Sequence, residues 1–356
     1  MWDLAKRTAV VLGTGLLFAA AALLLYASRW VLIVFLFAIF FADLLQPLVS
    51  RMQGWTKLSR GSPAVAILET YAIVGFIVAL LALAAGGRIA GELRLLGAEL
   101  PALIEKVNSG QIAQQLGTRH RWSYETQGYL QDFLARHSAG VLALEGKLAE
   151  YIAAFAQNLV WFVLIPILAF FFLKDGRAFV DELVRMVERT RRQRFVRRIF
   201  EDLNQMVTHY VRAQLALAAV ALVVYTLMFW LISVPYSFAL SSIAGIMEFI
   251  PVVGPATAAV VVLGVCFLES YPHLLIMVVL LGLWRVAQDY VISPRVLGNN
   301  LEMHPLASIF AVLVGAEVWG VVGVYLSIPI MAGLRILWRG WQTYSDSPAD
   351  TGPRRV

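Results

Sequence analysis

Long apolar stretches run through this chain and constrain its fold more than any other feature of the sequence. Several of them have about 18 or more residues, which is enough for a helix to cross the hydrocarbon core of a bilayer. The chain is 60% hydrophobic and only 15% charged, whereas soluble domains are about 45–50% apolar and about 25% charged. A soluble fold would have to bury all of these stretches in one core. We therefore predict an all-α polytopic membrane protein.

The apolar stretches divide into about eight predicted membrane segments, since one crossing needs roughly 20 residues. The segments are 9–27, 30–49, 64–85, 151–173, 207–231, 236–268, 272–292 and 306–338. Prolines interrupt the segment 236–268, and the final segment is too long for one untilted crossing. We expect these two segments to be broken helices.

Changes of polarity along the chain predict six regions. The regions are N-terminal transmembrane helices in 1–85, an extracytoplasmic helical module in 86–150, a fourth transmembrane helix in 151–173, a basic cytoplasmic helical connector in 174–206, a transport core in 207–340 and a cytoplasmic tail in 341–356. The module has leucines at helical spacing, but it is too polar to cross a membrane.

Basic residues set the predicted orientation of the segments. The stretch RTRRQRFVRR at 189–198 belongs in the cytoplasm, because loops rich in Lys and Arg stay inside. Counting segments from there places both chain ends in the cytoplasm of a bacterial inner membrane. The net charge of +6 is explained by this orientation, so we expect membrane lipids as partners and no nucleic acid. Cys266, the single cysteine, rules out an intramolecular disulfide.

A short motif occurs once in each of the two broken segments. Residues 248–255 read EFIPVVGP and residues 317–324 read EVWGVVGV, so both match E-x-x-[P/G]-V-V-G. Chance is one explanation, because Val-Val-Gly is common in membrane sequences. The shared carboxylate and helix breaker favour a true pair, and paired breaks in two halves mark the binding sites of many transporters. The residues that we assign to the breaks are Pro251, Gly254 and Pro255 in the first copy and Gly320 and Gly323 in the second.

Two topologies fit these breaks. Both segments could cross the membrane as kinked helices, or both could be re-entrant hairpins that enter and return on one side, from opposite faces. Kinked helices would place the acidic loop at 269–271 inside and the basic connector near Arg295 outside, and hairpins reverse both. The charges of these loops favour hairpins.

Four charged residues in the apolar segments are candidates for a transport site, because ionisable groups in a membrane are expensive and usually functional. Glu248 and Glu317 stand at the two breaks, and Arg285 and Asp289 lie four residues apart on one helix face. The alternatives are structural: Glu317 could lie at an interface beside Trp319, and Arg285 could simply pair with Asp289.

Three polar residues are secondary candidates: Asp43, Gln288 and Asn299. The nucleotide-binding motif GxxxxGK[ST] is absent, as are HExxH, GxSxG and paired-cysteine motifs. We therefore predict that the chain is not an enzyme and needs no ATP, cofactor or metal. Coupling to a proton or sodium gradient is the expected source of energy.

Several of these motifs resemble the AI-2E family of bacterial membrane proteins, which are also described as autoinducer-2 exporters or PerM-like permeases. The resemblance rests on Asp43 with Pro47, FFLKDG at 171–176, IPVVGP at 250–255, the connector from DYVISPRVLG to HPL at 289–306, and Gly315, Gly320, Gly323 and Pro329. It implies about eight membrane segments, transport without ATP, and homo-oligomers such as pentamers. Gln288 and Tyr290 depart from the family pattern around Asp289.

The resemblance and the charged segments together predict a secondary transporter that exports a small polar solute, such as a signalling molecule like autoinducer-2. Some family members exchange sodium or lithium for protons, so a cation/proton antiporter is the alternative within the same class. An oligomeric membrane scaffold without transport activity is the alternative from a different class, and a channel would also need a polar site in the membrane.

Overall fold

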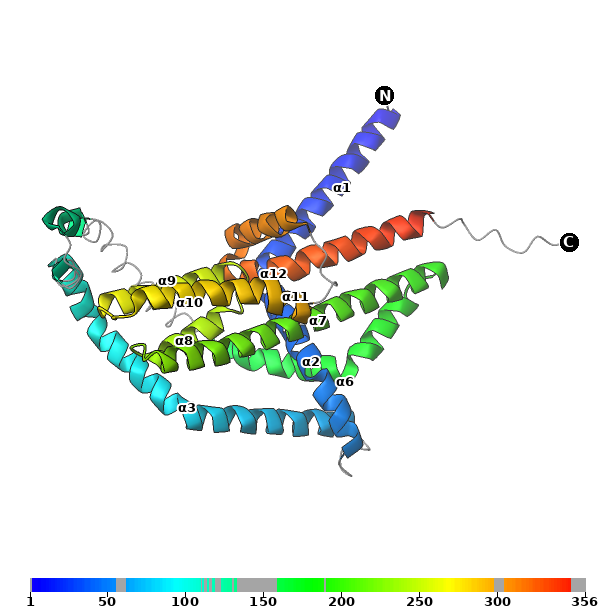
Figure 1. Ribbon diagram of the computed structural model, residues 1–356. Helices are drawn as coiled ribbons and strands as arrows, with labels where there is room; N and C mark the ends of the chain where they lie inside the picture. The colour runs from blue at the N-terminus through cyan, green and yellow to red at the C-terminus, as the bar shows by residue number, and fades with distance from the viewer. Residues whose placement is uncertain are drawn as a thin grey trace. The chain divides into compact units, whose positions relative to one another are not determined.

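The computed structural model describes residues 2–55, 62–109, 159–188, 190–297 and 304–346, with short pieces between 111 and 132. These residues are helical almost throughout, and they contain no strand (Figure 1). The all-α prediction is therefore confirmed for this part of the chain. Most of the predicted module after residue 109, and the candidate Asn299, lie outside the described residues.

The helices group into two units. The first contains α1 (Trp2–Ala27), α2 (Arg29–Trp55), the start of α3 (Pro63–Asn108) and most of α6 (Leu159–Arg185). Its core contains small and aliphatic side chains, since Ala38, Ile67 and Ala169 are fully buried. At its surface the partly exposed ring of Phe35 meets Phe172 edge to face at 6.0 Å.

The second unit contains the rest of α3 and every helix from α7 onward. These helices are α7 (Thr190–Leu231), α8 (Ser237–Met247), α9 (Val253–Leu268), α10 (Leu274–Ala287), the π-helix η2 (Gln288–Ile292), α11 (Ser293–Leu297) and α12 (Pro305–Asp346). Helix α7 contacts α8, α11 and α12. Glycine permits a close approach of α8 to α7, because a side-chain carbon on Gly245 of α8 would lie only 2.8 Å from Leu222 of α7.

Five described helices are long and apolar enough to cross a membrane. They span Arg29–Trp55, Pro63–Leu103, Thr190–Leu231, Leu274–Val296 and Leu306–Ser345. Shorter apolar helices occur at Leu12–Ala21, Ser237–Met247 and Val253–Leu268. The chain is thus a multi-pass helical membrane protein, while the count of about eight segments stays a prediction.

Two helices extend well beyond the predicted membrane segments. Helix α3 has 46 residues and α7 has 42, which correspond to about 69 Å and about 63 Å of helix. Both lengths are roughly twice the hydrocarbon thickness of about 30 Å. The third membrane segment and the start of the module are therefore one helix, as are the basic stretch at 190–206 and the fifth segment.

Helices α8 and α9 form a tight antiparallel hairpin, which we call the first hairpin. Its tip is the turn at 248–252, and its base is closed by a hydrogen bond of 3.3 Å from the Tyr236 hydroxyl to Glu269. Leu240 of α8 and Val262 of α9 lie in the same buried core. The chain therefore folds back at the predicted break and does not continue as one kinked helix.

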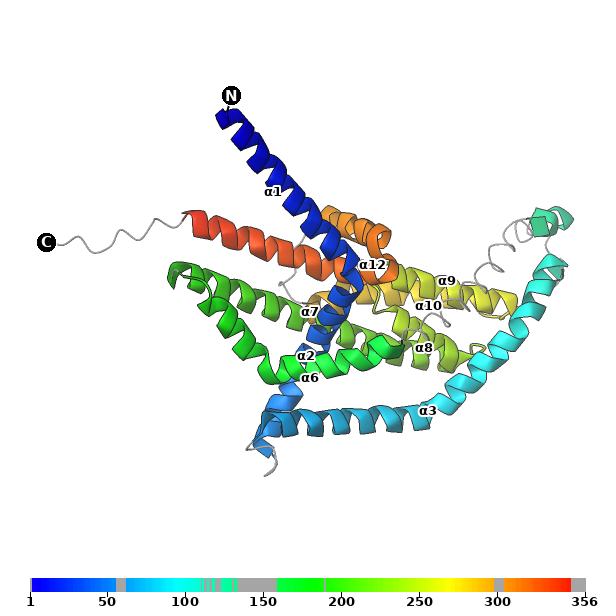
Figure 2. The same ribbon diagram turned by 180° about the vertical axis from the view of Figure 1, so that it is seen from behind.

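Helix α12 also folds back on itself, at Trp319 and Gly320, and we call its two arms the second hairpin (Figures 1 and 2). Gly320 has φ 58°, which favours glycine. The arms 305–318 and 321–346 touch through backbone, because a side-chain carbon on Gly323 would lie 1.9 Å from the Gly315 carbonyl oxygen. The second arm packs on α7, where the Tyr210 hydroxyl donates to the Tyr325 carbonyl at 3.1 Å.

Candidate functional site

The carboxylate of Glu248 is buried at the tip of the first hairpin. Glu248 ends α8, and only 4% of its surface is exposed. The helix stops here because Pro251 has no amide hydrogen, and Val252 then adopts φ 67°. Turn hydrogen bonds satisfy the local backbone, from Ile250 to Met247 at 2.9 Å and from Gly254 to Ile250 at 2.9 Å. The break is thus a defined turn that holds a carboxylate in the interior of the unit.

Side chains from three other helices, α10, η2 and α7, contact Glu248. The amide of Gln288 donates to its Oε1 atom, and the guanidinium of Arg285 lies 3.6 Å from the same atom. On the other side, the amide of Gln214 on α7 donates to the Glu248 carbonyl oxygen at 2.7 Å. Because Gln288 is only 3% exposed, the hydrogen bond between it and Glu248 is shielded from solvent.

Arg285 connects Glu248 to a second carboxylate. Its Nε and Nη2 atoms each lie 2.7 Å from an oxygen of Asp289, in a two-pronged ion pair. The pair is partly open, with 40% of the Arg285 side chain and 42% of the Asp289 side chain exposed. We call Glu248, Arg285, Gln288 and Asp289 the Glu248 cluster. It has two carboxylates for one guanidinium, and so it carries one excess negative charge when both carboxylates are ionised.

The π-helix η2 presents Gln288 and Asp289 to the cluster. It interrupts the α-helical path between α10 and α11 over five residues. Such π-helical insertions occur often at functional sites, because they shift the direction of side chains within a helix. Here Gln288 is buried toward Glu248, while its neighbour Asp289 is partly exposed beside Arg285. The Glu248 cluster therefore has one buried side and one accessible side.

The glycine of each motif packs against the preceding arm of its hairpin. A side-chain carbon on Gly254 would lie 1.8 Å from the Met247 carbonyl oxygen, which is nearly the geometry of Gly323 against Gly315. The two motif copies therefore lie at equivalent places in two hairpins. Pro255 is buried beside Gly254.

The predicted charged residues do not all meet. Glu248, Arg285 and Asp289 come together, with Gln288 as an additional member. Glu317 is exposed on the second hairpin, and among the described residues no ion pair joins it to the Glu248 cluster. Asp43 is buried in α2, in the first unit.

Comparison with known proteins identifies the family. Residues 15–341 match the AI-2E family of transporters. The chain belongs to the AI-2E family. The resemblance found in the motifs is therefore confirmed over nearly the whole length of the chain.

Individual relatives of this AI-2E chain are distant. YrrI of Bacillus subtilis (strain 168) is 29% identical over a region that spans about half of each chain, 49% of both. MT0215 of Mycobacterium tuberculosis is 26% identical, and the alignment covers 89% of this chain and 85% of MT0215. A protein of Halobacillus andaensis named a sodium-lithium/proton antiporter is 24% identical, with 91% and 92% covered.

Three residues near Glu248 in this AI-2E chain were missed by the sequence reasoning. Gln214 could have been found, because it is a polar residue within the predicted membrane segment 207–231, and the structure buries it to 6% exposure. Tyr225 and Trp284 gave no such signal, since aromatic residues are common in apolar segments. Their rings pack 6.0 Å apart, nearly perpendicular, between α7 and α10.

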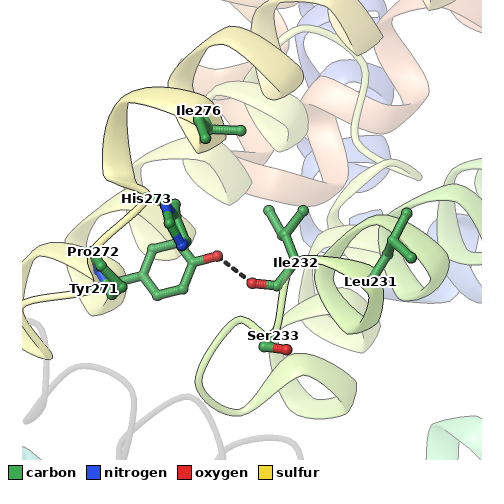
Figure 3. Close-up of a pocket in the computed structure, with 7 residues that line it drawn as sticks. All are labelled: Leu231, Ile232, Ser233, Tyr271, Pro272, His273 and Ile276. Atoms are coloured by element: carbon green, nitrogen blue, oxygen red, sulfur yellow. Dashed lines mark hydrogen bonds between the residues drawn. The ribbon is translucent and has the colours of Figure 1, made fainter.

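A pocket of about 500 Å³ lies at the other end of the first hairpin, between the end of α7 and the start of α10 (Figure 3). Its lining includes Ser233, Tyr271 and His273, and the Tyr271 hydroxyl points to the Ile232 carbonyl (Figure 3). No member of the Glu248 cluster lines it. Among the described residues, no three metal-binding side chains gather at either place.

Proposed function

We propose that this chain is an ATP-independent secondary transporter of the bacterial inner membrane, which exports a small polar solute such as a signalling molecule. The observation that supports this proposal most is the buried Glu248 carboxylate at a helix break, joined through Arg285 to a partly exposed Asp289. Charged groups in membrane segments occur on substrate and ion pathways. Membership of the AI-2E transporter family supports the same class.

The arrangement of the cluster suggests how coupling would work. Arg285 contacts both carboxylates, so protonation of either one releases it toward the other or toward a substrate. In this scheme both hairpins are re-entrant from opposite faces, and their tips line the path. The length of α8 supports this, since 11 residues make only about 16 Å of helix. Both chain ends are cytoplasmic in the scheme, and several copies form a homo-oligomer.

Exchange of sodium or lithium for protons is the second candidate function. The excess carboxylate of the Glu248 cluster favours it, because a net negative site accepts a proton or a monovalent cation better than an anion. The name of the Halobacillus andaensis relative, which aligns over 91% of this chain, gives further support.

Flux measurements on purified protein in proteoliposomes test the proposal. We expect Glu248→Gln to lower solute or cation flux by roughly tenfold to a hundredfold, because misplaced groups at a working site have effects of that order. Glu105→Gln is the matched control, since Glu105 is an exposed carboxylate on α3. Imposed proton and sodium gradients with a panel of solutes distinguish export from antiport.

Three outcomes would contradict the proposal. Equal flux and equal pH dependence in wild type and Glu248→Gln would remove Glu248 from the mechanism. Absence of flux for every solute and ion in assembled, stable protein would instead favour a membrane scaffold. Flux at the rate of free diffusion, without any response to gradients, would favour a channel.

A further inference from the structure

One face of α3 lies against the base of the first hairpin, far from the Glu248 cluster in sequence and at the opposite end of α8 (Figures 1 and 2). The residues of this face recur every three or four positions: Arg88, Glu92, Leu96 and Glu99. That spacing places them on one side of the helix. We call these four residues the α3 face.

Glu92 provides the N-terminal cap that α8 lacks locally. The residue before α8, Tyr236, makes no side-chain capping hydrogen bond. Instead the Glu92 carboxylate accepts hydrogen bonds from the backbone amides of Phe238 at 2.8 Å and Ala239 at 2.9 Å, from 146 and 147 positions earlier in the chain. A carboxylate at a helix N-terminus binds free amides and also complements the helix dipole. The start of α8 is thus fixed to α3.

Other residues of the α3 face strengthen this contact. The Tyr236 hydroxyl donates to Glu99 and lies 3.3 Å from Glu269. Arg88 stacks 5.3 Å from the Phe238 ring centre, and Leu96 belongs to the core that contains Leu240.

The base of the hairpin needs such support because its backbone is strained. Ser233 and Tyr236 before α8, and Ser270 after α9, have φ of 55°, 53° and 51°. Non-glycine residues in this region are strained and persist only when their surroundings hold them. Without the α3 face, the joint at Tyr236 would lose its hydrogen bond to Glu99 and the start of α8 would lose its cap, so we expect α8 to shift.

A shift of α8 would reach Glu248 directly. The helix has 11 residues, so its capped start and Glu248 are about 16 Å apart. Ala239, Leu240 and Ala244 are buried along its length, and packed helices move as rigid elements.

We propose that Glu92 and Glu99 are positioning residues, which set the place of Glu248 relative to Gln288 and Arg285 by fixing the base of α8. The proposal rests on the proposed function in treating Glu248 as the coupling carboxylate. It adds α3, which carries no residue of the Glu248 cluster, to the parts that control the site.

Chemical labelling of Glu248 tests this positioning without any transport measurement. Dicyclohexylcarbodiimide modifies buried carboxyl groups, and mass spectrometry of the digested protein measures the rate at Glu248. In the Glu92→Gln variant, the Glu248 carboxyl should no longer be held against Gln288 and Arg285. We therefore expect the rate of labelling at Glu248 to rise by about fivefold or more, the range of a typical coupling between sites. Tyr236→Phe, which removes one hydroxyl, should show a smaller change. Glu105→Gln should match wild type.

A covalent tether between α3 and α8 provides the second part of the test. In a Cys266→Ser background, Glu92→Cys and Ser237→Cys, at the partly exposed start of α8, are joined by a short bis-methanethiosulfonate linker. We expect the unlinked double-cysteine protein to label quickly at Glu248 and to transport more slowly than wild type. The linker should restore slow labelling and flux, and reduction of its disulfides should reverse both effects. Unchanged labelling in Glu92→Gln and Tyr236→Phe would overturn the proposal. Restored labelling with abolished flux would also overturn it, because α3 would then have to release α8 during transport.

Failure of the proposed function gives a different result. If Glu248→Gln transports like wild type while Glu92→Gln still changes labelling, the α3 face positions a carboxylate that transport does not use.

Discussion

At the scale of single residues, the Glu248 cluster shows how a membrane protein keeps a carboxylate in its interior. Gln288 and Arg285 together satisfy one oxygen of Glu248, and Asp289 holds the guanidinium with two short contacts. A buried charge without such partners would be strongly destabilising. Gln288, a residue that departs from the family pattern, therefore supplies the main hydrogen bond to the Glu248 carboxylate.

This role of Gln288 predicts a loss of stability when its amide is removed. Gln288→Leu keeps the volume similar but leaves Glu248 without its buried donor, which should lower the free energy of unfolding by about 1–3 kcal/mol. Titration of the detergent-solubilised protein with a denaturing detergent measures it. Gln342→Leu, on the exposed end of α12, is the control. Equal stability of the Gln288 variant and wild type would show that the donor is not needed.

At the scale of elements, the two hairpins use the same device at their tips. In each, the glycine that ends the E-x-x-[P/G]-V-V-G motif touches a backbone carbonyl of the preceding arm, Met247 for Gly254 and Gly315 for Gly323. The first hairpin turns through Val252 and the second through Gly320, both with positive φ. The sequence match between the motifs thus corresponds to a shared geometry.

The close backbone contacts predict a sharp difference between glycines. Gly254→Ala and Gly323→Ala would place a methyl group 1.8 Å and 1.9 Å from a carbonyl oxygen, so the arms must separate. We expect each variant to lose about 1–3 kcal/mol of stability, as for overpacked cores. Gly264→Ala, in α9 with nothing within 4 Å, should be neutral or more stable by up to about 1 kcal/mol. Thermal unfolding in detergent compares them, and equal losses at all three sites would contradict the hairpin geometry.

At the scale of the whole molecule, the large apolar side chains that remain exposed on the membrane helices, such as Phe76 and Leu283, require apolar surroundings. Lipid acyl chains or further copies of the chain can supply them. The side of the membrane on which each loop lies depends on whether a hairpin crosses the bilayer or returns to the side from which it entered. If the first hairpin is re-entrant, as proposed, we predict the loop before α10 outside and Arg295 inside, with the basic start of α7 in the cytoplasm.

Labelling of single cysteines tests this topology. In a Cys266→Ser background, an impermeant maleimide should label His273→Cys from outside the cell and Arg295→Cys only in inside-out vesicles. Ser345→Cys, at the end of α12, should label from the cytoplasmic side and serves as the reference. The reverse pattern for His273 and Arg295 would show that the first hairpin crosses the membrane.

The sequence alone predicted the features that depend on residues close together along the chain. Apolar length identified the helices, proline and glycine identified both breaks, and the spacing of Arg285 and Asp289 predicted their ion pair, because all of these act between residues a few positions apart. The sequence also singled out Glu248, because an ionisable group in a membrane segment is energetically costly and is usually functional.

The tertiary structure decided which of these residues meet. Glu248 pairs with Gln288 across 40 positions, Glu92 caps α8 across 146 positions, and Glu317 faces outward although its motif matches that of Glu248. Long-range pairs depend on how helices pack, and in lipid that packing follows from close backbone contact and hydrogen bonding between helices, since helix surfaces and lipid are similarly apolar. Local sequence patterns carry little information about such packing, so it could be seen only in the folded chain.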